Sequence, residues 1–155
     1  VHATAAFGFS EAYSRYVRTL PADEMDRFYA EGAPVAALYG ADTPPNSRAE
    51  LDTIFARMAP KLEPSDIVFE FFTIVRAAPI LPVKAVQRLM VRAAVSMTPD
   101  WARETLGLGR EFGLRRGEHT LLRAMGAAAD RFVIEEAPPA QSCKRLGLPA
   151  NYLYR

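Results

Sequence analysis

The sequence predicts an all-α protein. Apolar residues recur at the helical spacing of three and four through most of the 155 residues. A capping box, Ser47-Arg48-Ala49-Glu50, marks the start of one helix. Residues 67–75 are rich enough in aromatic and β-branched residues to suit a buried strand, but no partner strand is predicted nearby. We therefore expect one multi-helix unit without internal repeats or a domain boundary.

The first two expected helices cover residues 2–20 and 21–40. Steps of three and four from His2 reach an apolar series, while the intervening positions carry charge. Pro21 and the two carboxylates that follow it are typical of a helix start, because proline presets φ and carboxylates favour the positive helix end. Gly40 is suited to end the second helix.

A third helix is expected over residues 47–62, and it is interrupted at Pro60 because proline lacks the amide hydrogen that a helix interior needs. Residues 67–75 are apolar on all sides, so we interpret them as a fourth, central helix. Further helices are predicted at residues 82–97, at 98–107 as a short capped helix, and at 118–133. The Pro-containing segment 137–155 is expected to form an irregular tail.

Composition and charge exclude several classes of function. The formal net charge is +1 and no block of like charges occurs, so nucleic acid is not expected as a partner. Lys84, Arg88 and Arg92 do form a basic row on one helix face; this row is either a solvated face or a contact for an anionic group. The most apolar stretch, residues 67–83, is interrupted by charges and prolines, so no membrane segment is predicted.

The reactive side chains are few. Cys143 is the only cysteine, which rules out an intrachain disulfide and permits a reducing compartment; we expect a cytoplasmic location. With one cysteine and two histidines, His2 and His119, the chain cannot build a Cys/His zinc site alone. His119 falls on the polar side of its helix. No phosphate-binding loop or nucleophile elbow is present, so hydrolase and nucleotide chemistry are unsupported.

His2 and Arg103 are the two candidate site residues. His2 points toward the apolar face of a helix, where a buried imidazole needs a hydrogen-bond partner, a metal or a cofactor. It is either a satisfied core histidine or a cofactor-contacting or substrate-contacting residue. Arg103 follows Trp101 on the short capped helix. It either braces helix ends or holds a carboxylate, for which the guanidinium fork is suited.

Several segments together resemble one family, the MpaB-type oxygenases, which include the rubber-cleaving latex clearing proteins. The likeness covers most of the chain and depends on the order and spacing of short motifs. These motifs are Val1-His2-Ala3-Thr4, Tyr16-Val17-Arg18-Thr19-Leu20, Phe28-Tyr29-Ala30-Glu31, Ala37-Leu38-Tyr39-Gly40, Arg48-Ala49-Glu50-Leu51, and Thr98-Pro99-Asp100-Trp101-Ala102-Arg103-Glu104-Thr105-Leu106-Gly107-Leu108.

The resemblance implies an all-α fold around haem b, with dioxygen and a hydrophobic, isoprenoid-like small molecule as reactants. In the family pattern the axial histidine precedes the segment that matches Val1-His2-Ala3-Thr4, so no metal ligand is assigned within this chain. His2 then corresponds to a second histidine near the haem pocket, with a pocket or hydrogen-bonding role. Arg103 matches an arginine of the pattern, and the match does not give its role.

The expected protein is therefore the C-terminal part of a haem-dependent oxygenase domain over residues 1–155, with the N-terminal part missing. Such a fragment is expected to expose apolar surface on its first and fourth helices, and it need not bind haem or be active by itself. The rival interpretation is a non-enzymatic helical protein that binds an apolar ligand or partner, with His2 simply buried.

Overall fold

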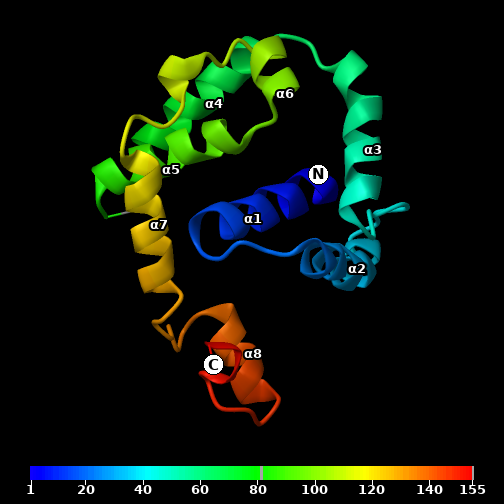
Figure 1. Cartoon of the computed structure of the whole chain (residues 1–155), viewed down its shortest axis with the longest axis vertical. Helices are drawn as coiled ribbons and strands as arrows, with labels where there is room; N and C mark the ends of the chain where they lie inside the picture. Colours follow the sequence, from blue (N-terminus) through cyan, green and yellow to red (C-terminus); the bar gives the residue numbers. More distant parts are fainter. Residues whose placement is uncertain (81, 155) are drawn as a thin grey trace.

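The computed structural model describes residues 1–80 and 82–154, so Leu81 of the apolar stretch and Arg155 of the expected tail lie outside the description. Over the described residues the chain forms helices and no strand, which confirms the all-α class (Figure 1). In chain order the elements are α1 (His2–Tyr16), α2 (Ala22–Leu38), α3 (Arg48–Met58), η1 (Ala59–Lys61), α4 (Asp66–Ala77), α5 (Lys84–Met97), α6 (Asp100–Thr105), η2 (Arg110–Phe112), α7 (Glu118–Ala129), α8 (Pro138–Arg145) and η3 (Tyr152–Tyr154).

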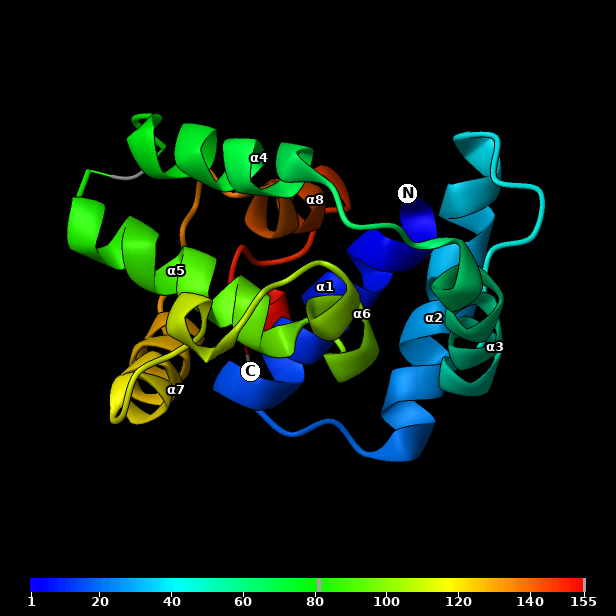
Figure 2. The same ribbon diagram turned by 90° about the horizontal axis from the view of Figure 1, so that it is seen from above.

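Helix α1 lies at the centre, and α2, α3, α5 and α7 all contact it (Figures 1 and 2). Its first half packs against α2 and α3, and its second half packs against α5 and α7. The first buried cluster consists of Ala6, Met25, Tyr29 and Leu51. The second consists of Tyr16, Leu89, Ala93 and Leu122. Both clusters therefore depend on one helix, which separates them along its length.

The contact between α1 and α7 requires a glycine. A Cβ atom placed on Gly126 would lie 2.2 Å from the carbonyl oxygen of Tyr16, far inside van der Waals distance. The backbone of α7 therefore packs directly on the C-terminal end of α1, as only a residue without a side chain permits.

A charged network joins the first three helices. The Glu11 carboxylate accepts hydrogen bonds from Arg15 Nε at 2.9 Å and from Arg48 Nη1 of α3 at 2.5 Å. Arg48 also donates through Nε to Asp52 at 3.0 Å, and its backbone amide donates to Asp26 of α2 at 2.8 Å. Burial by itself raises the pKa of Glu11, but the two arginines outweigh it and hold this pKa below its usual value of 4.5.

Two sequence-predicted helix boundaries are confirmed. The Ser47 hydroxyl caps α3 by accepting from the Glu50 amide at 3.2 Å, as predicted. The reciprocal bond differs, because the Glu50 carboxylate accepts from the Asn46 amide at 2.7 Å. Gly40 adopts φ of 78° after α2, and its amide and that of Ala41 close the helix end on two carbonyls of the last turn.

The predicted central position of residues 67–75 is wrong, although their helical state is confirmed. Helix α4 lies on the outside against α5 (Figure 2), and no α4 residue is buried. Ile67 is 72% exposed and Phe71 is 58% exposed. Phe9 of α1 is also 72% exposed, so the first and fourth helices do present apolar surface. An all-round apolar pattern shows that a helix can be buried, but neighbouring helices decide whether it is.

The expected irregular tail at 137–155 is also wrong in part, because it contains α8 and η3. Pro138 occupies the first turn of α8, where a missing amide hydrogen costs nothing, so the proline starts the helix. The helices predicted at 2–20 and 118–133 end earlier, at Tyr16 and Ala129.

The basic row on α5 has specific partners. The Lys84 ammonium donates to the carbonyls of Ala77 and Ala78 at the end of α4. Arg92 forms a two-contact ion pair with Glu118 at the start of α7. The row is therefore more than a solvated face, because two of its three members join α5 to its neighbours.

Gly126→Ala is expected to lower the free energy of unfolding by about 1–3 kcal/mol, because the added methyl overlaps the α1 backbone. Gly8→Ala in α1 is the matched control: a Cβ there meets nothing within 4 Å. That control should gain about 0.5–1 kcal/mol, the usual difference between alanine and glycine in a helix. Urea unfolding followed by circular dichroism measures both, and equal changes in the two variants would contradict the close approach.

Glu11→Gln should cost about 2 kcal/mol at pH 7, because it weakens two charge-assisted hydrogen bonds. The folded-state pKa of Glu11 is lowered, so its stabilisation is present above pH 4.5 and is lost as the pH falls through that lower pKa. The difference between wild type and variant should therefore shrink below pH 4.5. Glu24→Gln, which removes an exposed pair with Arg18, should change stability by less than about 0.5 kcal/mol.

Candidate functional site

His2 lies at the edge of a small groove between α1 and α2. The groove has a volume of about 140 Å³ and is lined by His2, Ala5, Ala6, Phe9, Phe28, Tyr29 and Gly32. A Cβ on Gly32 would meet nothing within 4 Å, so the absence of a side chain there keeps the groove open. The predicted inward orientation of His2 agrees with this position.

The imidazole of His2 has an unused polar atom. Its Nδ1 is buried and has no hydrogen-bond partner among the described residues. The other polar group of the groove is engaged, because the Tyr29 hydroxyl and Ser10 Oγ form a buried hydrogen bond of 2.9 Å. Burial raises the pKa of Tyr29, which keeps its phenol protonated. A buried polar atom without a partner is rare and calls for an explanation, and a ligand of this groove would supply one.

Arg103 lies in a different depression, of about 460 Å³, which is formed by α6 and the loop after it and shares no lining residue with the His2 groove. Its Nη2 donates to Asp100 Oδ1 at 2.7 Å within the same helix. Its Nε is buried without a partner among the described residues. The structure thus does not bring Arg103 and His2 into one pocket, but these two side chains share the property of an unsatisfied buried nitrogen.

A larger apolar cavity lies on the opposite side of α1 from the groove. It has a volume of about 350 Å³ and is enclosed by α1, α3, α5 and α6. Its wall includes Phe7, Gly8, Phe55, Met58, Met97 and Trp101. The rings of Phe7 and Phe55 meet edge to face at 5.2 Å, and Trp101 packs on Phe55 at 6.2 Å.

The sequence singled out only Trp101 among these wall residues. Of the others, Phe55, Met58 and Met97 belong to apolar stripes that are equally consistent with ordinary core packing, whereas Phe7 and Gly8 lie outside the stripe predicted for the first helix. Helical spacing places apolar residues on one face of each helix, but it does not show that four such faces leave a space between them. No signal in the sequence identifies this cavity.

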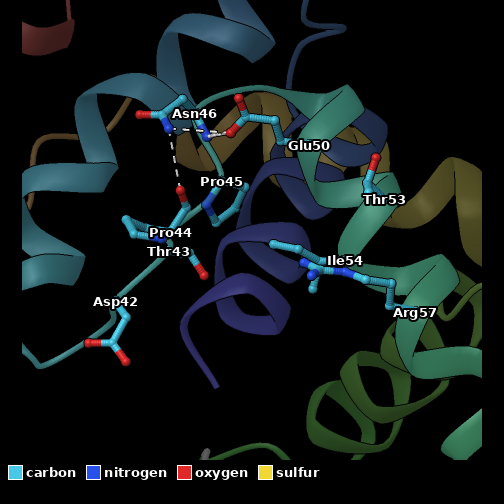
Figure 3. Close-up of a pocket in the computed structure, with 9 residues that line it drawn as sticks. All are labelled: Asp42, Thr43, Pro44, Pro45, Asn46, Glu50, Thr53, Ile54 and Arg57. Carbon is cyan, nitrogen blue, oxygen red and sulfur yellow. Dashed lines mark hydrogen bonds between the residues drawn. The ribbon is translucent and has the colours of Figure 1, made fainter.

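A fourth hollow, of about 420 Å³, lies between the loop at residues 42–46 and α3 (Figure 3). Its polar groups have structural tasks: the Asn46 amide and side chain both donate to Glu50, and the Asn46 side chain also donates to the Pro44 carbonyl. It contains no histidine or cysteine. It is therefore a less suitable place for redox or nucleophilic chemistry than the His2 groove.

The remaining reactive side chains do not assemble into a site. His119 is exposed on α7 with its ring 5.6 Å from that of Tyr16, and Cys143 is buried in α8. Among the described residues, no group of three histidine, cysteine or carboxylate side chains is placed to hold a metal ion. In the same part of the chain, no helix has the length and apolar character that crossing a membrane requires.

Comparison with known proteins gives one family. Residues 1–131 match the family described as ER-bound oxygenase mpaB/B'/Rubber oxygenase, catalytic domain. The matched residues include α1 to α7, and with them the groove, the apolar cavity, His2 and Arg103, whereas α8 lies beyond the match. Neither the curated proteins nor the solved structures give a match to the chain.

His2→Leu is expected to leave stability unchanged or to raise it by about 1 kcal/mol, because it removes a buried nitrogen that has no partner. Ser10→Ala, in the same helix, breaks the buried bond to Tyr29 and should cost about 1 kcal/mol. Chemical denaturation of both variants tests this contrast. A loss of stability in His2→Leu as large as that in Ser10→Ala would make His2 a structural residue.

Proposed function

Because the chain belongs to the mpaB/rubber oxygenase catalytic-domain family, we propose that it forms part of a haem-binding oxygenase site that acts on a hydrophobic small molecule. The observation that carries the proposal is the buried Nδ1 of His2, which has no partner and faces an apolar groove. A groove with one open hydrogen-bonding atom and otherwise apolar walls suits contact with a largely apolar cofactor or substrate.

Two features of the described residues are of the kind that a haem pocket uses, but they lie in separate hollows. The apolar wall beside His2, in a groove of about 140 Å³, suits contact with one edge of a flat macrocycle, and the buried Nε of Arg103 is a donor of the kind that binds carboxylates. His2 acts in this proposal as a hydrogen-bonding residue of the pocket, and Arg103 is a candidate for a carboxylate contact. Haem, when bound, supplies the oxygen chemistry.

The chain's own contribution is orientation and exclusion of water. His2 Nδ1 donates a hydrogen bond when it carries the ring proton and accepts one in the other tautomer, so it can orient a polar atom in the groove. The apolar cavity of about 350 Å³ lies across α1 from this groove, and its aromatic wall offers water few hydrogen-bond partners.

The same cavity also supports a second candidate function, a helical protein that binds an apolar ligand without catalysis. The observation in its favour is that the cavity wall carries no titratable side chain. The two candidate functions differ in whether the protein binds haem. A haem-free protein that binds apolar ligands would fit the second, and a haem-loaded protein fits the first.

The haem content of the full-length protein tests the proposal directly. The protein is purified from cells supplied with haem precursor, and its haem per chain is measured as the pyridine haemochrome. About one haem per chain is the expected result for a b-type oxygenase. A folded protein that remains free of haem would overturn the haem assignment and favour the ligand-binding alternative.

Two variants test the role of the groove in haem binding. His2→Leu should weaken haem affinity by about tenfold, as loss of a supporting hydrogen bond near a metal centre does. Gly32→Leu should weaken it further because it fills the groove. His119→Leu replaces the exposed histidine of α7 and is the matched control, expected to bind haem like wild type. Equal affinity in His2→Leu and His119→Leu would remove His2 from the site.

A further inference from the structure

We propose that the apolar cavity and an adjoining arginine-lined mouth together bind one amphiphile, which has a hydrocarbon chain and a carboxylate head. This inference adds a ligand-binding site to the proposed function and does not rest on it. The binding itself requires neither haem nor His2, because both cavities lie across α1 from the groove.

The mouth is a second hollow of about 360 Å³ at the meeting point of α1, α3 and the segment that joins α5 to α6. It shares five wall residues with the apolar cavity, so the two spaces adjoin. The shared residues are Phe7, Phe55, Met97, Thr98 and Pro99. The pair of Phe7 and Phe55 forms the boundary, and two aromatic rings are a surface along which a hydrocarbon chain can pass.

The apolar cavity and the mouth differ in the charged side chains that line them. The apolar cavity has no charged side chain in its wall, whereas the mouth is lined by Arg15, Arg48 and Asp100. Asp100 already pairs with Arg103. Glu11 accepts from both mouth arginines, and Asp52 is an exposed partner of Arg48. Counted together, the guanidinium groups of Arg15, Arg48 and Arg103 are balanced by the carboxylates of Glu11, Asp52 and Asp100, so the mouth offers a carboxylate head unused hydrogen-bond donors and not a net positive charge.

The arginines keep donors for such a head group. Arg15 donates through Nε to Glu11 and through Nη1 to the Ser96 carbonyl, and Arg48 donates through Nε and Nη1. Within the described residues, no hydrogen bond uses Nη2 of either side chain. A guanidinium held on one carboxylate is preorganised for a second one, because its fork geometry is fixed. The Arg48 guanidinium also lies 5.5 Å from the centre of the Phe7 ring, where the charged mouth meets the apolar wall.

The contrast between an apolar cavity and a mouth with unused arginine donors indicates the ligand class. A neutral hydrocarbon would leave the mouth empty, and a small anion would leave the apolar cavity empty. An amphiphile fills both, with its chain beside Trp101 and Met97 and its carboxylate at Arg15 and Arg48. The chemical class is therefore a medium-chain carboxylic acid.

Trp101 is the only tryptophan and lies in the cavity wall, so its fluorescence reports binding directly. Decanoate is titrated into the full chain below its micelle concentration, and decan-1-ol provides the neutral ligand of the same length. Decanoate is expected to shift the Trp101 emission to the blue, as water leaves the indole, with an affinity about fivefold or more above that of the alcohol. Equal affinities, or no spectral change with decanoate, would overturn the proposal.

Arg15→Gln should reduce decanoate affinity by about fivefold and leave that of decan-1-ol unchanged. Arg18→Gln is the matched control: it lies just beyond α1, loses a comparable ion pair with Glu24, and does not line the mouth. Equal losses for acid and alcohol in Arg15→Gln would show that the arginine does not contact the head group.

Gly8→Leu fills the cavity without disturbing the backbone, because a Cβ at Gly8 meets nothing within 4 Å. It should reduce binding of both ligands by about tenfold or more through loss of the space for their hydrocarbon chain. Gly32→Leu fills the groove on the other side of α1 and should leave decanoate binding intact. Loss in Gly32→Leu with retention in Gly8→Leu would move the ligand to the groove and overturn the inference.

The outcomes of these experiments distinguish a failure of this inference from a failure of the proposed function. Decanoate binding that requires Arg15 in a protein without haem would sustain this inference while the haem assignment fails. A haem-loaded protein whose Trp101 does not respond to decanoate would sustain the oxygenase and overturn the amphiphile.

Discussion

The Glu11 carboxylate is the interaction on which the arrangement of the first three helices depends. It lies on the central helix and accepts from Arg15 of that helix and from Arg48 of α3, whose backbone amide is bound in turn by Asp26 of α2. A carboxylate this little exposed is stable only while both cations remain in place, since an unpaired buried charge is costly. The three helices are therefore fixed relative to one another by a single charged centre, beside the apolar cluster of Ala6, Met25, Tyr29 and Leu51.

The same charged centre lies between the two hollows on opposite sides of α1, the apolar cavity and the His2 groove. By holding α3 against α1, it encloses the apolar cavity between Phe7 and Phe55 and places two guanidinium groups at the cavity's mouth. On the other side of α1, packing with α2 leaves the groove that contains His2. Helix α1 thus separates the groove proposed for the cofactor from the apolar cavity and its mouth.

Several apolar side chains of α1 and α4 are exposed to solvent. Phe9 on α1 and Ile67 and Phe71 on α4 are largely open to solvent, although their residue types are those of a core. On α5, two charged side chains contact neighbouring helices. Lys84 donates to carbonyls at the end of α4, and Arg92 pairs with Glu118 at the start of α7. Residue type alone therefore assigns burial wrongly for these apolar side chains, since burial depends on which helix packs on which face.

The sequence by itself determined the helical class, most helix starts, and the resemblance to the oxygenase family, because these depend on local patterns. Ser47 caps α3 and Gly40 ends α2 through bonds within a few residues of each, so periodicity and capping chemistry suffice to predict them. The inward orientation of His2 is likewise a local property of its helix.

Tertiary structure alone decided the rest. It placed α1 and not α4 at the centre, formed α8 where an irregular tail was expected, and separated His2 from Arg103. It also created the cavity and its arginine mouth from residues up to 102 positions apart in the sequence, Thr4 to Leu106. The reason is physical: a repeat of three and four residues shows which face of a helix is apolar, but only packing against other helices decides what that face meets.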